Sequence, residues 1–377
     1  MMAKQTEEPL CCALVGCGKV AQKHLDAILS HKKELSLSGL VDTQPEAARA
    51  LLQRKGAEKR GIPVYSDLQT LLKNEKTDLV AITTPSGTHY NLARQALQAR
   101  KHVLVEKPMT LSLSEADMLL AVAKEQGVQI AVGHIYRYFP LVSDLEKDLR
   151  MGRFGRILYG DVKVRWGHDQ AYYDSAPWRG TWTQDGGVLM NQSIHALDLM
   201  TWLLCGSITE VCGWIDQQMH KIEAEDLGLA MFKLCNGAYC LLEGTTNTNP
   251  KRHEASFTIM CSEGEIKAGL NGSKLQFQVI DRHGRNLTSQ YIRRYLHKTG
   301  RAHEIHTLKH LKNPHYALYK DLISSIRQQH PPLADGHSGR NAVEAILAVY
   351  ASAKEKRTIP LPLVDFSLQD MDGYFSD

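Results

Sequence analysis

Short, continuously apolar runs alternate with amphipathic segments through the first 135 residues of the chain. Such runs are typical of parallel strands that are buried on both faces, and the segments between them have helical spacing. The pattern predicts six strands, at residues 10–15, 35–41, 61–65, 78–82, 102–105 and 129–132. It predicts helices between them, at residues 20–30, 47–55, 68–73, 90–99 and 114–125. This alternation indicates an α/β fold with a doubly wound parallel sheet.

Beyond residue 135 the pattern changes to strand-like runs that follow one another without helices between them. These runs lie at residues 156–166, 208–215, 227–234, 238–245, 256–261 and 275–280. The pair Asn236-Gly237 separates two of them and is a strong hairpin signal. Helices are expected at residues 141–150, 316–328 and 338–355. We therefore predict a first domain over residues 1–135 and a second, α+β domain over 136–377, built on a large open, mainly antiparallel sheet.

Composition narrows the class of protein. A chain of 377 residues with 43% apolar residues exceeds the roughly 100–200 residues of one domain, which agrees with two. A net charge of +4 is too mild for a nucleic-acid-binding protein. The eight cysteines form no C-x-x-C pair and several lie in apolar runs, so we expect a reducing, cytoplasmic location. We expect no signal peptide, no membrane span, no metal site and no G-x-S-x-G nucleophile.

The first strand runs directly into a glycine-rich turn, G-C-G-K-V-A at residues 16–21. In a dinucleotide-binding turn Gly16 would allow the tight bend and Gly18 would let the backbone approach a pyrophosphate. The phosphates would lie at the N-terminus of the next helix, beside Lys19 and Val20, where unpaired N–H groups favour anions. A glycine turn in a protein that binds no nucleotide is the alternative, and the strand, turn, helix and following acid together weaken it.

That acid is Asp42, which ends the second strand 24 positions after Gly18. Its carboxylate can accept both hydroxyls of an adenosine ribose and would repel a 2′-phosphate. We therefore expect NAD rather than NADP as the cofactor. In such sheets ligands bind at the carboxyl ends of the strands, where Lys107 and His134 also fall. Further cofactor contacts are expected there from Thr84, Pro85, His89 and Glu106.

Four motifs occur in a fixed order: the turn at 16–21, T-P-S-G-T-H at 84–89, E-K-P at 106–108, and D-G-G-V-L-M-N-Q-S-I-H-A-L-D at 185–198. Together they resemble the Gfo/Idh/MocA oxidoreductases, named after glucose–fructose oxidoreductase, inositol dehydrogenase and rhizopine catabolism. The resemblance implies an N-terminal Rossmann domain, a C-terminal α/β substrate domain, and NAD or NADP acting on sugars or cyclitols. It also implies that Lys107 is the active-site lysine and His195 the active-site histidine. We expect a homodimer or homotetramer formed through the C-terminal sheet.

Asn191, His195 and Asp198 have the spacing of one face of a helix, which is either a hydrogen-bonded edge or part of a site. In inositol dehydrogenase-like members the position of Asn191 is usually Asp. A carboxylate there would raise the proton affinity of the histidine, whereas an amide can only orient it or bind a substrate hydroxyl. The string M-N-Q-S-I-H, preceded by W-R-G-T-W, resembles enzymes that oxidise nucleotide-linked amino sugars at C3, such as UDP-N-acetylglucosaminuronate dehydrogenases. Some cyclitol-oxidising relatives carry similar strings.

The resemblance favours removal of a hydride from a secondary alcohol to the nicotinamide, with Lys107 or His195 taking the hydroxyl proton. Arg179 could pair with a carboxylate or phosphate of the substrate, and Trp178 lies beside it. Arg137, at the domain junction, is a further candidate substrate contact. The alternatives are a structural salt bridge for Arg179, inter-domain packing for Arg137, and a solvated strand end for Lys107.

A basic run over residues 282–310 either meets an anionic sugar or diphosphate or is a solvated loop or oligomer contact. Three functions remain open. They are an NAD-dependent sugar dehydrogenase, a glycosidase that oxidises and re-reduces its substrate with bound NAD, and a catalytically silent NAD sensor. Retention of both Lys107 and His195 argues against the sensor.

We predict that Asp42→Ala weakens NAD binding and reduces discrimination against NADP, because the carboxylate that accepts the ribose hydroxyls and repels a 2′-phosphate is lost. Titration of both cofactors into the wild type and the variant measures this. Tighter binding of NADP than of NAD by the wild type would contradict the assignment.

Overall fold

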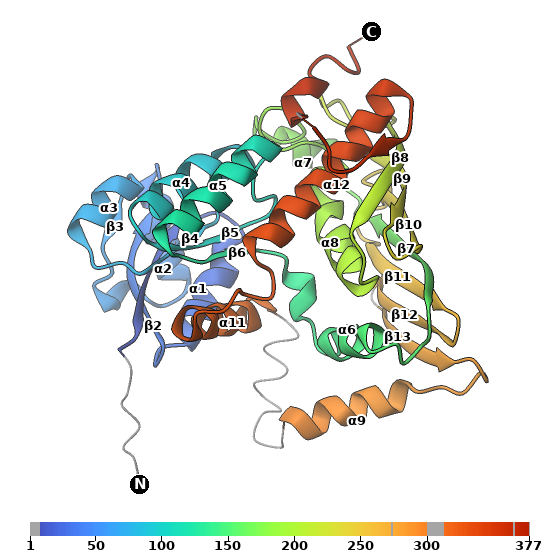
Figure 1. The fold of residues 1–377 in the computed structure, drawn as a ribbon. Coiled ribbons are helices and arrows are strands. Elements are labelled where there is room, and N and C mark those ends of the chain that lie inside the picture. Colours follow the sequence, from blue (N-terminus) through green and yellow to red (C-terminus); the bar gives the residue numbers. More distant parts are fainter. Residues whose placement is uncertain (1–7, 273, 300–312, 365, 377) are drawn as a thin grey trace.

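The computed structural model describes residues 8–272, 274–299, 313–364 and 366–376, which form two sheets with helices between and around them (Figure 1). The N-terminal sheet is parallel throughout and has the order β3-β2-β1-β4-β5-β6. Its strands are β1 (Leu10–Val15), β2 (Leu35–Val41), β3 (Val64–Tyr65), β4 (Leu79–Ile82), β5 (His102–Val105) and β6 (Ile130–Val132). The predicted doubly wound sheet is confirmed, with β3 shorter than expected.

The central strands are apolar at every position because both faces of the sheet are covered. In β1, Cys12 and Leu14 pack on one face with α1, whereas Ala13 and Val15 pack on the other. All four side chains are buried. The helices are α1 (Ala21–Ser30), α2 (Pro45–Arg54), α3 (Leu68–Asn74), α4 (His89–Gln98) and α5 (Leu113–Gln126). The alternation of side chains along each strand therefore fills two separate layers.

The C-terminal sheet has the order β13-β12-β11-β7-β10-β9-β8-β14, and every pair is antiparallel except β7 with β10. Gly237, with φ +83°, makes the predicted hairpin between β9 and β10. The strands are β7 (Ile157–Arg165), β8 (Ile208–Asp216), β9 (Leu227–Leu234), β10 (Tyr239–Thr245), β11 (Glu254–Cys261), β12 (Gly264–Asn271), β13 (Lys274–Asp281) and β14 (Ile359–Pro360). The open, mainly antiparallel sheet is confirmed. The sequence pattern missed β12, whose glycines and charged residues give no clear alternation, and the two-residue β14.

Helices cover the side of this sheet that faces the N-terminal domain (Figure 1). They are α6 (Val142–Arg150), α8 (Ile194–Leu203) and α12 (Gly336–Glu355), with the short α7 (Gln170–Asp174) in a nearby loop. In contrast, α11 (His315–Gln328) returns to the N-terminal domain and lies against α1. Leu318, Tyr319 and Leu322 are fully buried in the same apolar cluster as Leu25. The predicted second domain thus contributes one helix to the core of the first.

The basic run is not a simple loop, because α9 (Thr288–Thr299) occupies its centre. Three of its arginines form ion pairs, Arg282 with Glu263, Arg285 with Asp281 and Arg294 with Asp148. The loop expectation is therefore wrong for residues 288–299, and the rest of the run from residue 300 lies outside the described residues. Among the helices that the structure describes, none is long and apolar enough to cross a membrane.

Candidate active site

The glycine-rich turn has the geometry that a bound pyrophosphate needs. Gly16 has φ +87°, and a Cβ there would lie 2.8 Å from backbone atoms of Thr83 and Thr84, so only glycine fits. Gly18 is exposed, and a Cβ added to it would meet nothing within 4 Å. No side chain caps the N-terminus of α1 at Val20. The Lys23 amide donates to the Val20 carbonyl at 2.9 Å, so an anion would be met by the amides that precede Lys23.

Asp42 lies beside this turn at the end of β2. Its Oδ2 accepts a hydrogen bond of 2.8 Å from the Cys17 amide, and Oδ1 accepts one of 2.9 Å from the Gln44 amide. Each oxygen keeps a further lone pair for a ribose hydroxyl. The carboxylate is therefore fixed in place next to the turn before any cofactor binds.

The loop after β4 is tied to the loop after β5. The buried His89 ring contacts the Thr84 carbonyl at 2.9 Å through Nε2 and the Pro108 carbonyl at 2.7 Å through Nδ1. Burial lowers the pKa of His89. A neutral imidazole donates its one N–H to one of these two carbonyls, so the ring links the two loops. The cofactor contact of His89 stays a prediction. Thr84 and Pro85 stay predictions as cofactor contacts.

Glu106 is buried in the helical layer, where two histidines meet its carboxylate. Its Oε1 contacts His24 Nε2 on α1 at 2.9 Å and His315 Nε2 on α11 at 3.2 Å. Burial raises the pKa of Glu106, but the hydrogen bonds from the two histidines outweigh it and hold the pKa well below its usual range. These three side chains are of metal-binding types and lie close together, yet hydrogen bonds alone satisfy the carboxylate. The sequence pattern singled out neither histidine.

Lys107 points the other way, into the junction between the domains. Its Nζ donates a hydrogen bond to the main-chain carbonyl of Asn191, and the side-chain amide of Asn191 donates one to Asp185. Burial lowers the pKa of Lys107, and the charges of Glu106 and Asp185 partly oppose this shift. The structure thus brings Lys107 and Asn191 into contact. A lowered pKa makes the neutral amine, which can accept a proton, more accessible.

His195 is part of the same cluster. Its ring stacks on Tyr136, with centroids 5.1 Å apart, and meets the ring of His134 edge-on at 6.1 Å. Burial, and then the charge of Lys107, hold the pKa of His195 well below its usual range. The imidazole is therefore neutral at physiological pH. Within the described residues its buried Nδ1 has no hydrogen-bond partner.

The expected regular helix over this motif begins with a π-helical turn, Leu189–Ser193, before α8. As a result the predicted polar row is divided between two environments. Asn191 and His195 face the Lys107 cluster, whereas Asp198 accepts bonds of 2.8 and 2.7 Å from Arg137. Arg137 also donates to the Leu333 carbonyl at 2.9 Å. Arg137 is thus engaged in a buried ion pair at the domain junction, which matches the packing alternative for this residue.

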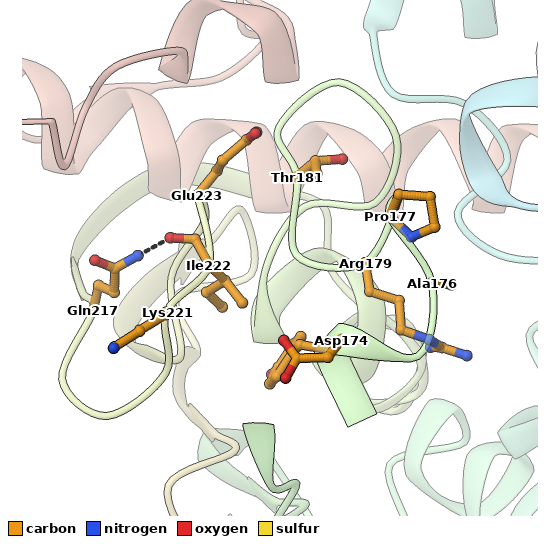
Figure 2. Close-up of a pocket in the computed structure, with 10 residues that line it drawn as sticks. Asp174, Ala176, Pro177, Arg179, Thr181, Gln217, Lys221, Ile222 and Glu223 are labelled. Carbon is orange, nitrogen blue, oxygen red and sulfur yellow. Dashed lines mark hydrogen bonds between the residues drawn. The ribbon is translucent and has the colours of Figure 1, made fainter. Parts of the chain in front are cut away.

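Arg179 and Trp178 lie in the loop that precedes this motif. The Arg179 guanidinium carbon is 4.2 Å from the ring centre of Tyr172 and 4.5 Å from that of Trp178. The loop borders an open pocket of about 560 Å³. Figure 2 shows Asp174, Ala176, Pro177, Arg179 and Thr181 on one side of this pocket and Gln217, Lys221, Ile222 and Glu223 on the other. Sequence reasoning missed the second side, which lies between β8 and β9.

Comparison with known proteins agrees with this geometry. A family model described as "Oxidoreductase family, NAD-binding Rossmann fold" matches residues 10–134. A model of the Gfo/Idh/MocA C-terminal domain matches residues 143–267. The fold and the site therefore define an NAD-dependent dehydrogenase that acts on CH–OH groups. The chain belongs to the Gfo/Idh/MocA oxidoreductase family.

Three relatives illustrate the range of this similarity. The scyllo-inositol 2-dehydrogenase (NAD(+)) of Bacillus subtilis is 28% identical over 70% of this chain and 75% of its own length. The WlbA dehydrogenase of Bordetella pertussis, solved with NADH and UDP-GlcNAcA, superposes with a TM-score of 0.79 at 30% identity, covering 94% of this chain and all of that one. WlbA from Chromobacterium violaceum, solved with the same ligands, superposes with a TM-score of 0.80 at 30% identity. This match covers 97% of this chain and 100% of that one.

We predict that Lys107→Ala lowers turnover by about 10²–10⁴-fold, because the amine that accepts or positions the proton is removed. NAD binding should change little, since the turn at residues 16–21 holds the pyrophosphate. Steady-state kinetics and cofactor titration measure both quantities. Lys124→Ala, at an exposed lysine on α5, is the control. Near wild-type turnover in Lys107→Ala would remove Lys107 from the mechanism.

Proposed function

We propose that this enzyme oxidises C3 of a nucleotide-linked amino sugar or uronate. The observation that carries the proposal is the similarity to the two WlbA dehydrogenases, which extends over 94% and 97% of this chain and whose structures hold NADH and UDP-GlcNAcA. The string around Asn191 favours the same subgroup.

In the proposed reaction the substrate hydroxyl lies between Lys107 and His195. Lys107 takes the hydroxyl proton, because burial lowers the pKa of its amine and so favours the neutral form that can accept a proton. His195 is neutral and orients the hydroxyl or the adjoining oxygen. NAD, when bound, supplies the nicotinamide carbon that accepts the hydride. Asp42 and the turn at residues 16–21 hold the adenosine ribose and the pyrophosphate.

Arg179 supports an anionic substrate. Its guanidinium carbon lies over the rings of Tyr172 and Trp178, and its Nη1 donates to the Tyr172 hydroxyl at 2.5 Å. Within the described residues its buried Nε has no hydrogen-bond partner. A planar guanidinium is suited to a carboxylate or diphosphate, and Arg179 belongs to the loop that borders the pocket of Figure 2.

A cyclitol or free sugar is the second candidate, because the scyllo-inositol dehydrogenase relative matches 70% of this chain. The two candidates differ in charge and size. An inositol carries no anion for Arg179, whereas a nucleotide sugar does.

We predict that the wild type forms NADH fastest with an acidic UDP-sugar in a panel of UDP-sugars, uronates and inositols, followed by absorbance. Arg179→Gln should raise KM for the acidic UDP-sugar by about tenfold or more, and KM for an inositol much less, because only the former loses a charged hydrogen bond. Preference for inositol over every nucleotide sugar would replace the proposal by the cyclitol alternative. Release of free sugar without net NADH would replace it by the glycosidase.

We also propose that the exposed face of the C-terminal sheet forms a homo-oligomer. Six large apolar side chains there are 41–67% exposed, and strand pairing places Tyr239 beside Tyr159, Met231 beside Leu241, and Trp214 beside Leu229. A contiguous apolar surface of this kind is typical of a protein interface. A second copy of the same chain can cover it around a two-fold axis.

We further propose a reducing, cytoplasmic location, which the eight unpaired cysteines support.

We predict that Trp214→Lys combined with Leu241→Lys converts the protein to a monomer, because two charges would be buried in the interface. Sedimentation or light scattering gives the mass in solution. Met151→Lys is the control, since Met151 is 72% exposed just beyond α6 and away from the sheet face. A wild type that is monomeric, or a double variant of unchanged mass, would contradict the interface.

A further inference from the structure

Two carboxylates lie close enough to the Lys107 amine for their charges to act on it. Glu106 belongs to the E-K-P motif, whereas Asp185 has no role in the mechanism described so far. Asp185 begins the D-G-G turn and is 2% exposed. Its Oδ2 accepts a hydrogen bond of 3.1 Å from the Gly180 amide, and its Oδ1 accepts one from the side chain of Asn191. A buried acid next to a reacting amine requires an explanation.

Asn191 joins the two groups. Its side-chain amide donates to Asp185, and its main-chain carbonyl accepts from Lys107 Nζ. Its side-chain oxygen accepts a further bond of 3.0 Å from Gln192. The residue lies in the π-helical turn, a distortion that is often found at functional sites. A shift of Asp185 would therefore move the carbonyl that holds the lysine.

We propose that Asp185 is a positioning residue for the reaction: through Asn191 it fixes the Lys107 amine, and its charge stabilises the protonated form of that amine. The inference rests on the proposed function, in which Lys107 takes the proton from the substrate hydroxyl. Asp185 itself touches neither substrate nor cofactor in this account.

The charges around the amine come from few groups. Those that act on Lys107, or on which it acts, are Glu106, Asp185, His89, His134 and His195. Burial lowers the pKa of each of the three histidines, so the two carboxylates are the charged partners. Burial raises the pKa of Asp185, and the hydrogen bonds from Gly180 and Asn191 and the charges of Lys107 and Arg179 oppose this shift. Loss of the Asp185 charge should therefore lower the pKa of Lys107 further, and the neutral amine should persist to lower pH.

The chain offers a matched pair of substitutions. Asp185→Asn removes the charge at nearly constant shape, but it leaves one N–H donor facing another. The double variant Asp185→Asn with Asn191→Asp exchanges the two side chains, so that the carboxylate stands at position 191 and its hydrogen-bond partner, the amide, at position 185. The new amide at position 185 then accepts from Gly180 and donates to the new carboxylate at position 191, which still accepts from Gln192. Asp161→Asn on β7 is the control for the same chemical change.

The first readout needs no sugar. Lys107 is acetylated with acetic anhydride over a range of pH in the full-length protein with NAD, and mass spectrometry gives the pH at which the amine becomes reactive. We expect Asp185→Asn to lower this apparent pKa by about one unit, as for loss of a nearby opposite charge. The double variant should return it toward the wild-type value, and Asp161→Asn should not move it. The acid limb of kcat/KM should move in the same direction in each variant.

A folded Asp185→Asn variant with the wild-type labelling pKa would overturn the inference. So would a double variant that melts like the wild type yet keeps the pKa of the single variant, because Asp185 would then act only as a cap for Gly180. If the single variant does not fold, the labelling pKa of the folded double variant decides: a value near that of the wild type supports the inference, and a value about one unit lower overturns it. A wild type that oxidises none of the sugars while the labelling pKa shifts as expected would defeat the proposed function and leave the coupling of Asp185 to Lys107 in place.

Discussion

The hydrogen bond from Lys107 to the Asn191 carbonyl is the contact on which the arrangement of the site depends. The lysine extends from the end of β5 in the parallel sheet, and the carbonyl lies on the segment that packs over the antiparallel sheet. An ammonium group can be buried at such a junction only if polar and charged partners surround it. Asn191, Glu106 and Asp185 meet this requirement from both halves of the chain, so the two sheets must be placed correctly before the amine has its environment.

The features that local sequence determines were predictable. The apolar run of β1 predicts a strand covered on both faces, and the structure confirms this with Cys12 and Leu14 on one side and Ala13 and Val15 on the other. The Asn236-Gly237 pair predicts its hairpin, because few residues other than glycine tolerate φ +83° at Gly237. The parallel pairing of the six strands follows from the alternation of strands and helices, since each crossover requires a helix.

The features that depend on distant partners were not predictable. His24 is 82 positions from Glu106 and His315 is 209 positions away, and neither spacing forms a local pattern. The π-helical turn shifts the register of the motif, so a regular helical projection gives one polar row where the structure has two environments. Asn191 suggests from sequence alone that the site lacks a carboxylate next to the helix. Folding brings Asp185 to that place from six residues earlier, through a turn that a helical projection does not describe.

The return of α11 to the N-terminal domain has a consequence for how the chain folds during synthesis. The strands of the parallel sheet are complete by residue 132, but Leu318, Tyr319 and Leu322 of its apolar layer are translated much later. Until then α1 has an uncovered apolar side, and Glu106 lacks the imidazole of His315. Contacts of such long sequence separation slow folding and leave an exposed surface that favours aggregation. The N-terminal domain therefore acquires its final core only after residues 315–328 have been translated, and chaperones have that interval in which to shield it.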